Sequence, residues 1–151
     1  MTLTFRRRRL AHVLLSASAL AACDAVGPTE RDDDLVRRPA VLAIGGDSAR
    51  VAAPDSVAVG ASFVVLVQSF GGGCIRAGET ETALDGLTAD VRPFDYFPAP
   101  SFDRVCTADL RIIEHPATLR FTRAGRATVR VHGRREPDDV PVVVVRTVVV
   151  R

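Results

Sequence analysis

The apolar positions of this chain fall into short runs that favour β-strands. From residue 40 onward, β-branched residues alternate with polar ones or form brief apolar runs, and glycine, proline or aspartate interrupts them at roughly eight- to fifteen-residue intervals. No segment sustains the period of an amphipathic helix. The pattern predicts an all-β fold of about seven antiparallel strands. The expected strands are residues 40–44 with 56–59 (one strand split at Pro54), 63–70, 87–91, 108–113, 117–121, 127–131 and 142–150.

The last two of these segments carry the clearest patterns. Val129 and Val131 alternate with polar neighbours, and residues 142–150 contain seven valines. The charged residues 134–139 between them are typical of a hairpin connection. We expect the valine-rich strand to be paired along the sheet, because such a strand associates readily with other chains when it is left open.

The run from Leu119 to Val131 resembles the late corner of an immunoglobulin-like sandwich. An apolar strand ends, Ala124 and Gly125 turn the chain, and an alternating strand begins. The resemblance implies a single antiparallel immunoglobulin-like (Greek-key) sandwich over residues 40–151. Ala127 stands where the ring of the tyrosine corner is expected, and the chain has no tryptophan to pack on a central disulfide. An antibody-type domain is therefore not implied.

The first residues have the layout of a secretory signal. Residues 6–9 are all arginine, and residues 10–22 are mostly apolar and end in small side chains, a run too short to span a bilayer. The sequence Leu20-Ala21-Ala22-Cys23 that closes this run resembles the lipobox of bacterial lipoproteins. The resemblance implies cleavage before Cys23, lipidation of its sulfur, and anchoring of the exported protein to the cell envelope at its periplasmic or outer face.

These features divide the chain into three parts. Residues 1–22 are the expected signal peptide, residues 23–39 the lipidated cysteine with a flexible linker, and residues 40–151 the β-sandwich domain. The linker is rich in charge and in structure-breaking residues and has no apolar periodicity.

Cleavage of the signal changes the electrostatic character of the chain. The whole sequence has 20 basic residues, all arginine, against 18 acidic ones, and removal of residues 6–9 leaves the mature protein slightly acidic. No clustered basic face remains for a nucleic-acid backbone, so nucleic acid is not an expected partner.

Two cysteines remain once Cys23 is assigned to lipid. An exported protein meets an oxidising compartment, so Cys74 and Cys106 are expected to form a disulfide. They have no neighbouring cluster of ligands that would favour a zinc site.

Aromatic residues concentrate in residues 91–104. Phe94, Tyr96, Phe97 and Phe102 lie there among three prolines, which we expect to keep the segment out of regular structure. One interpretation is that the rings cover an end of the core beneath the disulfide. The other is that they form a contact surface for a partner, since rigid rings supply area at low entropic cost. We expect Tyr96 to point outward and to be the best single candidate for such a contact.

The remaining residues favour no catalytic or metal chemistry. His115 and His132 are expected to be exposed and lack acidic or cysteine partners at ligand spacing, and no serine lies in a nucleophile elbow. No cofactor is expected. The sequence therefore predicts a non-catalytic envelope lipoprotein, anchored to the membrane through Cys23, that serves as a binding or structural accessory for an envelope protein partner. An immunoglobulin-like protease inhibitor and an envelope enzyme are the alternatives.

Replacing Cys23 tests the lipid anchor. Cys23→Ser removes the only sulfur that can take the lipid at this position, so the protein should be released from membranes or stay uncleaved. Mass spectrometry of the mature amino terminus measures the modification directly, and an unmodified terminus that begins elsewhere would contradict the lipoprotein assignment.

Overall fold

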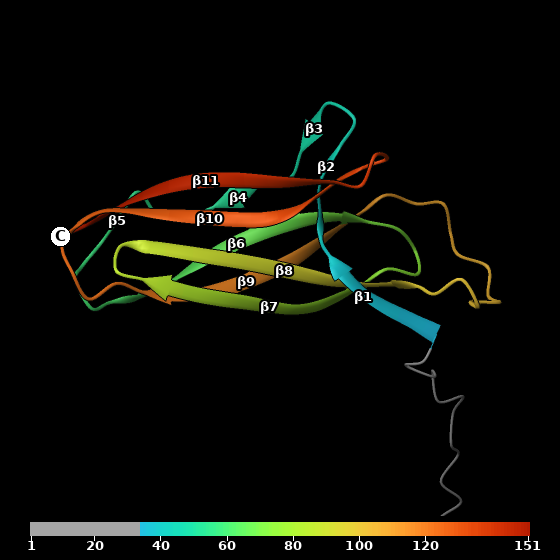
Figure 1. Cartoon of the computed structure of the whole chain (residues 1–151), viewed down its shortest axis with the longest axis horizontal. Helices are drawn as coiled ribbons and strands as arrows, with labels where there is room; N and C mark the ends of the chain where they lie inside the picture. The colour runs from blue at the N-terminus through green and yellow to red at the C-terminus, as the bar shows by residue number, and fades with distance from the viewer. Residues whose placement is uncertain (1–33) are drawn as a thin grey trace, which may run out of the picture. The chain divides into compact units, whose positions relative to one another are not determined.

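The computed structural model describes residues 34–151, so the predicted signal peptide, Cys23 and most of the linker lie outside the described residues. The described part is all β, and it contains no helix that could cross a membrane. Figure 1 shows its strands, which are β1 (Leu35–Pro39), β2 (Val41–Ile44), β3 (Asp47–Ser48), β4 (Val51–Ala52), β5 (Ser56–Val57), β6 (Ser62–Gly71), β7 (Arg76–Asp85), β8 (Thr88–Pro98), β9 (Arg111–Arg120), β10 (Gly125–Glu136) and β11 (Val140–Val150).

Strand β10 connects most of this sheet. It forms an antiparallel hairpin with β11, with Gly125 opposite Val150 and Arg135 opposite Val140. Its other edge has two neighbours in succession, and both run parallel to it: β8 beside residues 128–131 and β2 beside residues 134–136. The predicted hairpin connection and the pairing of the valine-rich strand are thus confirmed.

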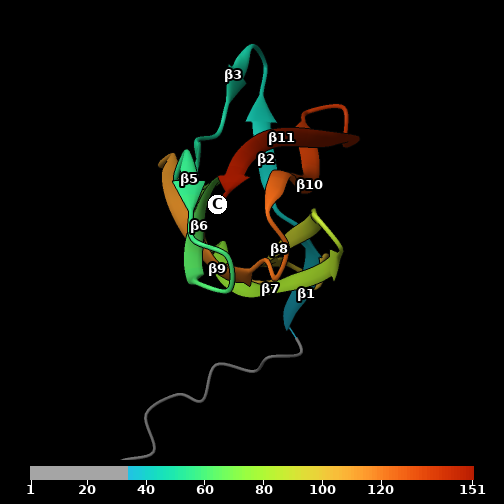
Figure 2. The same ribbon diagram turned by 90° about the vertical axis from the view of Figure 1, so that its left-hand side faces the viewer.

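The other strands extend from β8 and β6. Strand β8 pairs with β7 along one edge and with β1 on the other, while β6 pairs with β9, β4 and β2. The short β5 runs parallel to the end of β11. The end-on view in Figure 2 shows how the sheet curls around its own interior.

The sheet differs from the prediction in strand number and direction. It has eleven strands, and it is mixed because β10 has two parallel neighbours and β11 has one. Strand β7 was missed because it is an edge strand with mostly exposed, polar residues, so it lacks an apolar face. The two strands expected at 108–113 and 117–121 are one strand, β9, which runs through Pro116. Strand β9 pairs only with β6, so its other edge has no neighbouring strand. A proline, which has no backbone N–H to donate, is tolerated on such an edge strand.

Two further predictions were wrong, and both concern segments that pair with each other as β1 and β8. The last five residues of the expected linker form β1, because the backbone of β1 pairs with β8 from Leu35 opposite Pro98 to Pro39 opposite Phe94. The aromatic segment is in regular structure over most of its length, since β8 continues to Pro98. Pro93 is tolerated inside β8 because it lies where the neighbour of β8 changes from β10 to β1, and its carbonyl accepts a hydrogen bond from the amide of Ala40 at 3.0 Å.

The core consists of inward-facing residues at every second position of the long strands. Valines and alanines dominate it, with Leu42, Leu119 and Phe121 as the largest members. The ring of Phe63 packs on Phe121 with centroids 5.8 Å apart. The core residues are Leu42, Ala49, Val51, Val65, Val67, Ala89, Val91, Ala117, Leu119, Phe121, Ala127, Val129, Val131, Val148 and Val150.

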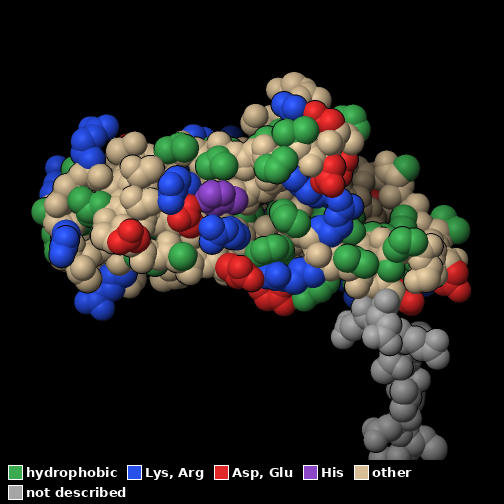
Figure 3. Space-filling view, viewed as in Figure 1, with side chains coloured by type: hydrophobic (Ala, Val, Ile, Leu, Met, Phe, Trp, Pro, Cys, Tyr) green, Lys and Arg blue, Asp and Glu red, His purple; other side chains and the backbone are tan. Residues whose placement is uncertain are grey.

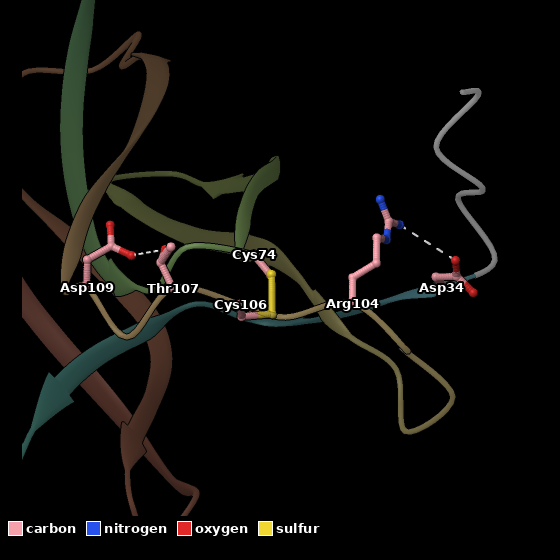
Figure 4. Close-up of a disulfide and its surroundings, with 6 residues drawn as sticks. All are labelled: Asp34, Cys74, Arg104, Cys106, Thr107 and Asp109. Atoms are coloured by element: carbon pink, nitrogen blue, oxygen red, sulfur yellow. Dashed lines mark hydrogen bonds and ion pairs between the residues drawn. A yellow bond between two sulfur atoms is a disulfide. The ribbon is translucent and has the colours of Figure 1, made fainter. Parts of the chain in front are cut away.

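The predicted disulfide is present. Cys74, just before β7, bonds to Cys106 in the loop between β8 and β9, with their Cα atoms 5.3 Å apart (Figure 4). The two segments also meet through the backbone, since the amide of Gly73 donates to the carbonyl of Thr107. A Cβ atom at position 73 would collide with the Thr107 side chain, so only glycine allows this approach. The bond crosslinks a 32-residue separation, which by loop-closure entropy stabilises the fold by roughly 3.5 to 4 kcal/mol.

Truncation at the last strand tests the role of β11. Deleting residues 142–151 removes Val148 and Val150 from the core and exposes the edge of β10, so the domain should unfold and aggregate. Circular dichroism and light scattering measure both effects. A soluble truncated protein with an unchanged melting temperature would contradict this role.

A matched pair of substitutions separates the two faces of β11. Val148 is fully buried, so Val148→Ala should lower the free energy of unfolding by about 2 kcal/mol. Val143 is 50% exposed, so Val143→Ala should change it by less than about 0.5 kcal/mol.

Candidate functional site

Three polar side chains meet inside the core. Ser69 on β6, Asp95 on β8 and His115 on β9 are all buried, with at most 1% of their surface exposed. Strands β6 and β9 place Ser69 and His115 on the same face, because Val67 lies opposite His115 and Ser69 follows two residues later. Asp95 reaches them from β8. We call these three residues the buried polar cluster.

The geometry of this cluster differs from that of a catalytic triad. The Ser69 hydroxyl donates to Asp95 Oδ2 at 2.9 Å and lies 2.9 Å from His115 Nε2. Asp95 Oδ1 lies 3.2 Å from the same nitrogen. In a Ser-His-Asp triad the acid binds the ring nitrogen opposite the one that faces the serine. Here His115 Nδ1 has no hydrogen-bond partner, and no cluster member reaches the surface.

Because the buried polar cluster is enclosed in the core, its hydrogen bonds bear on the stability of the fold. Buried polar groups without partners are destabilising, and the Ser69 hydroxyl satisfies one atom on each of the other two side chains. Asp95 Oδ1 and His115 Nδ1 are left without hydrogen bonds. The cluster joins β6 and β9 to β8 by polar contacts.

The sequence did not indicate this cluster, and the prediction that His115 is exposed is wrong, because its side chain is buried. A signal was available, because His115, Ala117 and Leu119 alternate on the inward face of β9, and Ser69 continues the alternation of Val65 and Val67 on β6. The prediction divided β9 near Pro116. It therefore left His115 outside the strand that contains Ala117 and Leu119, and their alternation was not recognised. The contact with Asp95 joins β8 to strands remote in sequence, so no local pattern contains it.

A second polar group lies on the surface, at the junction of β8 and β10. Asp90 accepts two hydrogen bonds from the guanidinium of Arg130, at 2.9 and 2.8 Å, and lies 2.6 Å from His132 Nε2. The parallel register places Asp90 directly opposite Arg130. Figure 3 shows basic, acidic and histidine side chains gathered over the middle of this face. The hydrogen bonds from Arg130 and then His132 lower the pKa of Asp90 from 3.8 to about 2.

The candidate contact residues Phe94 and Tyr96 lie on the outward side of β8. The guanidinium of Arg37, from β1, lies 3.4 Å from the centroid of the Phe94 ring. The Tyr96 hydroxyl donates to Glu79 Oε1 at 2.7 Å, and this hydrogen bond is the main reason that the pKa of Glu79 is lowered. Both rings are half-buried, and neither belongs to the core.

The other two candidate contact residues lie apart from this pair. Phe97 faces the opposite side of β8 and lies beneath the buried guanidinium of Arg134, at 4.7 Å from its ring centroid. Phe102 is in the loop after β8, and Arg104 lies 4.8 Å from its ring. The structure thus brings together Phe94 and Tyr96 and separates Phe97 and Phe102 from them.

A hollow of about 280 Å³ adjoins Tyr96. Leu35 of β1 and Arg76 and Ala77 of β7 form its other walls. It mixes apolar and charged groups in a volume just below that of typical small-molecule sites. A volume of this size is enough for one side chain.

The described residues contain no group of three or more histidine, cysteine or acidic side chains that could hold a metal ion. Comparisons of the chain with protein families and curated proteins, and of its fold with solved structures, find no match.

Removing the Ser69 hydroxyl tests the buried polar cluster. Ser69→Ala leaves Asp95 Oδ2 and His115 Nε2 without their bridging hydroxyl, so the free energy of unfolding should fall by about 1 to 3 kcal/mol. Urea denaturation measures the change. Ser62→Ala, at an exposed position of the same strand, is the control and should change it by less than about 0.5 kcal/mol. Labelling of Ser69 in the folded protein by a fluorophosphonate would contradict its inaccessibility.

The lowered pKa of Asp90 predicts a pH dependence of stability. Because folding favours the ionised carboxylate, its contribution is complete above the unfolded pKa of 3.8 and is lost as the pH falls toward about 2. The side chain is 18% exposed. After allowance for solvent screening, we expect the Asp90 carboxylate to contribute about 1 to 2 kcal/mol to the free energy of unfolding.

Substitution of this carboxylate isolates its contribution. Asp90→Asn should lower the unfolding free energy near pH 6 and have little effect at about pH 2, as followed by urea denaturation at both values. Asp85→Asn is the control, since Asp85 is exposed and has no ion pair within residues 34–151. Equal losses for Asp90→Asn at the two pH values would contradict the assignment.

Proposed function

We propose that this chain is a lipoprotein of the bacterial cell envelope whose β domain is a non-catalytic accessory that binds an envelope protein. The export signal and the Leu20-Ala21-Ala22-Cys23 sequence support the membrane anchor. The Cys74–Cys106 disulfide is consistent with folding in an oxidising compartment.

The outward face of β8 carries this proposal. Phe94 and Tyr96 occupy successive outward positions, outside the core, beside a hollow that fits one side chain. Arg37 and Glu79 hold the two rings in place through a cation–π contact and a hydrogen bond. Aromatic groups that are fixed before binding lose little entropy on association. We propose that Tyr96 is the main contact, with Phe94 beside it.

The buried polar cluster supports a binding role over an enzymatic one. It contains the residue types of a hydrolase, but its serine is inaccessible and its acid contacts the ring nitrogen that faces the serine. In a Ser-His-Asp triad the acid binds the other ring nitrogen and the serine is open to substrate.

We also propose that the fold is a variant of the immunoglobulin-like sandwich. Its β4 pairs antiparallel with β6, whereas β5, just after Pro54, runs parallel to the last strand β11. A first strand divided between an early strand and the last one is consistent with that family of folds. The parallel pairing of β8 with β10 departs from a purely antiparallel sandwich.

Alanine and phenylalanine at position 96 test the contact. Tyr96→Ala should abolish capture of the partner when the native lipoprotein is crosslinked in its own membranes, because it removes the ring from the face of β8. Its free energy of unfolding should change by no more than about 1 kcal/mol, since Tyr96 is outside the core. Tyr96→Phe keeps the ring and should retain capture.

The phenylalanine variants provide the comparison. Phe97→Ala removes a ring packed under buried Arg134 and should lower the unfolding free energy by about 1 to 3 kcal/mol. If Tyr96→Ala melts as low as the least stable of the Phe94, Phe97 and Phe102 alanine variants, the segment is structural and the contact is refuted. Capture of a protease at this surface would favour the inhibitor alternative.

A further inference from the structure

A small pocket lies where β8 leaves β10, and residues of β1, β8, β10 and β11 line it. Three prolines wall it, each at a point where the backbone pairing changes or begins: Pro39 at the end of β1, Pro93 at the change of neighbour of β8, and Pro141 near the start of β11. The side chains of Phe94, Arg92 and His132 complete its lining, together with the backbone at Gly133. We call it the proline pocket.

The size of the proline pocket limits what it can hold. Its volume is about 230 Å³, below the roughly 300 to 1,000 Å³ of sites that enclose a drug-sized ligand. One ring or branched side chain fits such a space. The proline rings lose no rotamer freedom on binding, so the walls are already in their binding conformation.

One cation on the rim is available to an anion. Arg92 is exposed and forms no ion pair within residues 34–151. Its neighbour across the β7–β8 ladder is Glu81, but that carboxylate accepts from Arg37. The other ionisable lining residue, His132, contacts Asp90, which is also held by Arg130.

We propose that the proline pocket binds an apolar group that bears a carboxylate. The apolar group contacts the exposed rings of Pro39 and Pro141 and the ring of Phe94, and the carboxylate binds the guanidinium of Arg92. A planar guanidinium matches a carboxylate with two parallel hydrogen bonds. A free aromatic acid and the carboxyl end of a peptide with an apolar last residue share this chemistry.

This inference deepens the proposed binding role, because it names the chemistry of one ligand group on the same face of β8. It depends neither on the membrane anchor nor on Tyr96. The two proposals can therefore fail separately: loss of partner capture in Tyr96→Ala leaves probe binding intact, and a failure of probe binding leaves the capture experiment valid.

Titration of the full mature chain with matched probes tests the pocket. Phenylacetate should bind saturably, with chemical-shift changes at residues that line the pocket. The neutral isostere 2-phenylacetamide and the ringless anion acetate should each bind at least about tenfold more weakly, the change in affinity that corresponds to about 1.4 kcal/mol. Equal binding of phenylacetate and either comparison probe, or no binding of phenylacetate, would overturn the proposal.

Arginine variants locate the anion site. Arg92→Gln should weaken phenylacetate binding at least about tenfold. Arg126→Gln should leave it unchanged, because Arg126 is exposed at the opposite end of β10 and does not line the pocket. If both variants bind phenylacetate as the parent protein does, the assignment of Arg92 is wrong.

A second pair of probes distinguishes the two ligand sources. Acetyl-Gly-Gly-Phe as the free acid should bind at least as tightly as phenylacetate if the pocket receives a peptide terminus, and its carboxamide should bind at least about tenfold more weakly. Binding of phenylacetate without binding of the peptide acid would assign the pocket to small aromatic acids.

Discussion

The backbone pairing of β10 is the constraint on which the rest of the described structure depends. One edge of this strand is occupied by β11 over its whole length, and the other edge is shared between β8 and β2. Because residues alternate sides along a strand, this register directs Ala127, Val129 and Val131 into the core and places Arg130 and His132 outside, opposite Asp90 on β8. A shift of one residue would exchange these two sets and bury the charges.

The division of β10 between two neighbours also creates the surface features described above. Strand β8 must leave β10 where β2 takes its place, and it then pairs with β1 instead. Pro39 and Pro93 lie at that divergence, which requires fewer backbone donors than a regular ladder. The same divergence brings Arg37 of β1 across Phe94 of β8. The proline pocket and the arginine-covered aromatic face thus have a common origin in the topology of the sheet.

The polar side chains described here lie in two places, inside the core and on the surface beside β8. This arrangement supports the proposed binding role. The buried polar cluster combines a serine, a histidine and an acid, yet the three side chains are enclosed in the core, where the Ser69 hydroxyl bridges Asp95 and His115. On the surface, the carboxylates beside β8 are mostly engaged by arginines, as in the pairs of Asp90 with Arg130 and of Glu79 with Arg37. The exposed Glu79–Arg37 pair contributes little stability, but Arg37 lies over the ring of Phe94 on the outward face.

The sequence alone determined the features that depend on local pattern: the all-β class, the β10–β11 hairpin, the long strand β6 and the pairing of Cys74 with Cys106. Period-two alternation and the number of cysteines are properties of the chain itself, so they can be read without a fold. Only the tertiary structure decided that β1 and β7 join the sheet, that β8 runs parallel to β10, and that Ser69, Asp95 and His115 meet. These outcomes depend on hydrogen bonds and contacts between distant segments. Polar edge strands and prolines within strands carry no apolar signal of their own, and their placement follows from the partners that the rest of the chain provides.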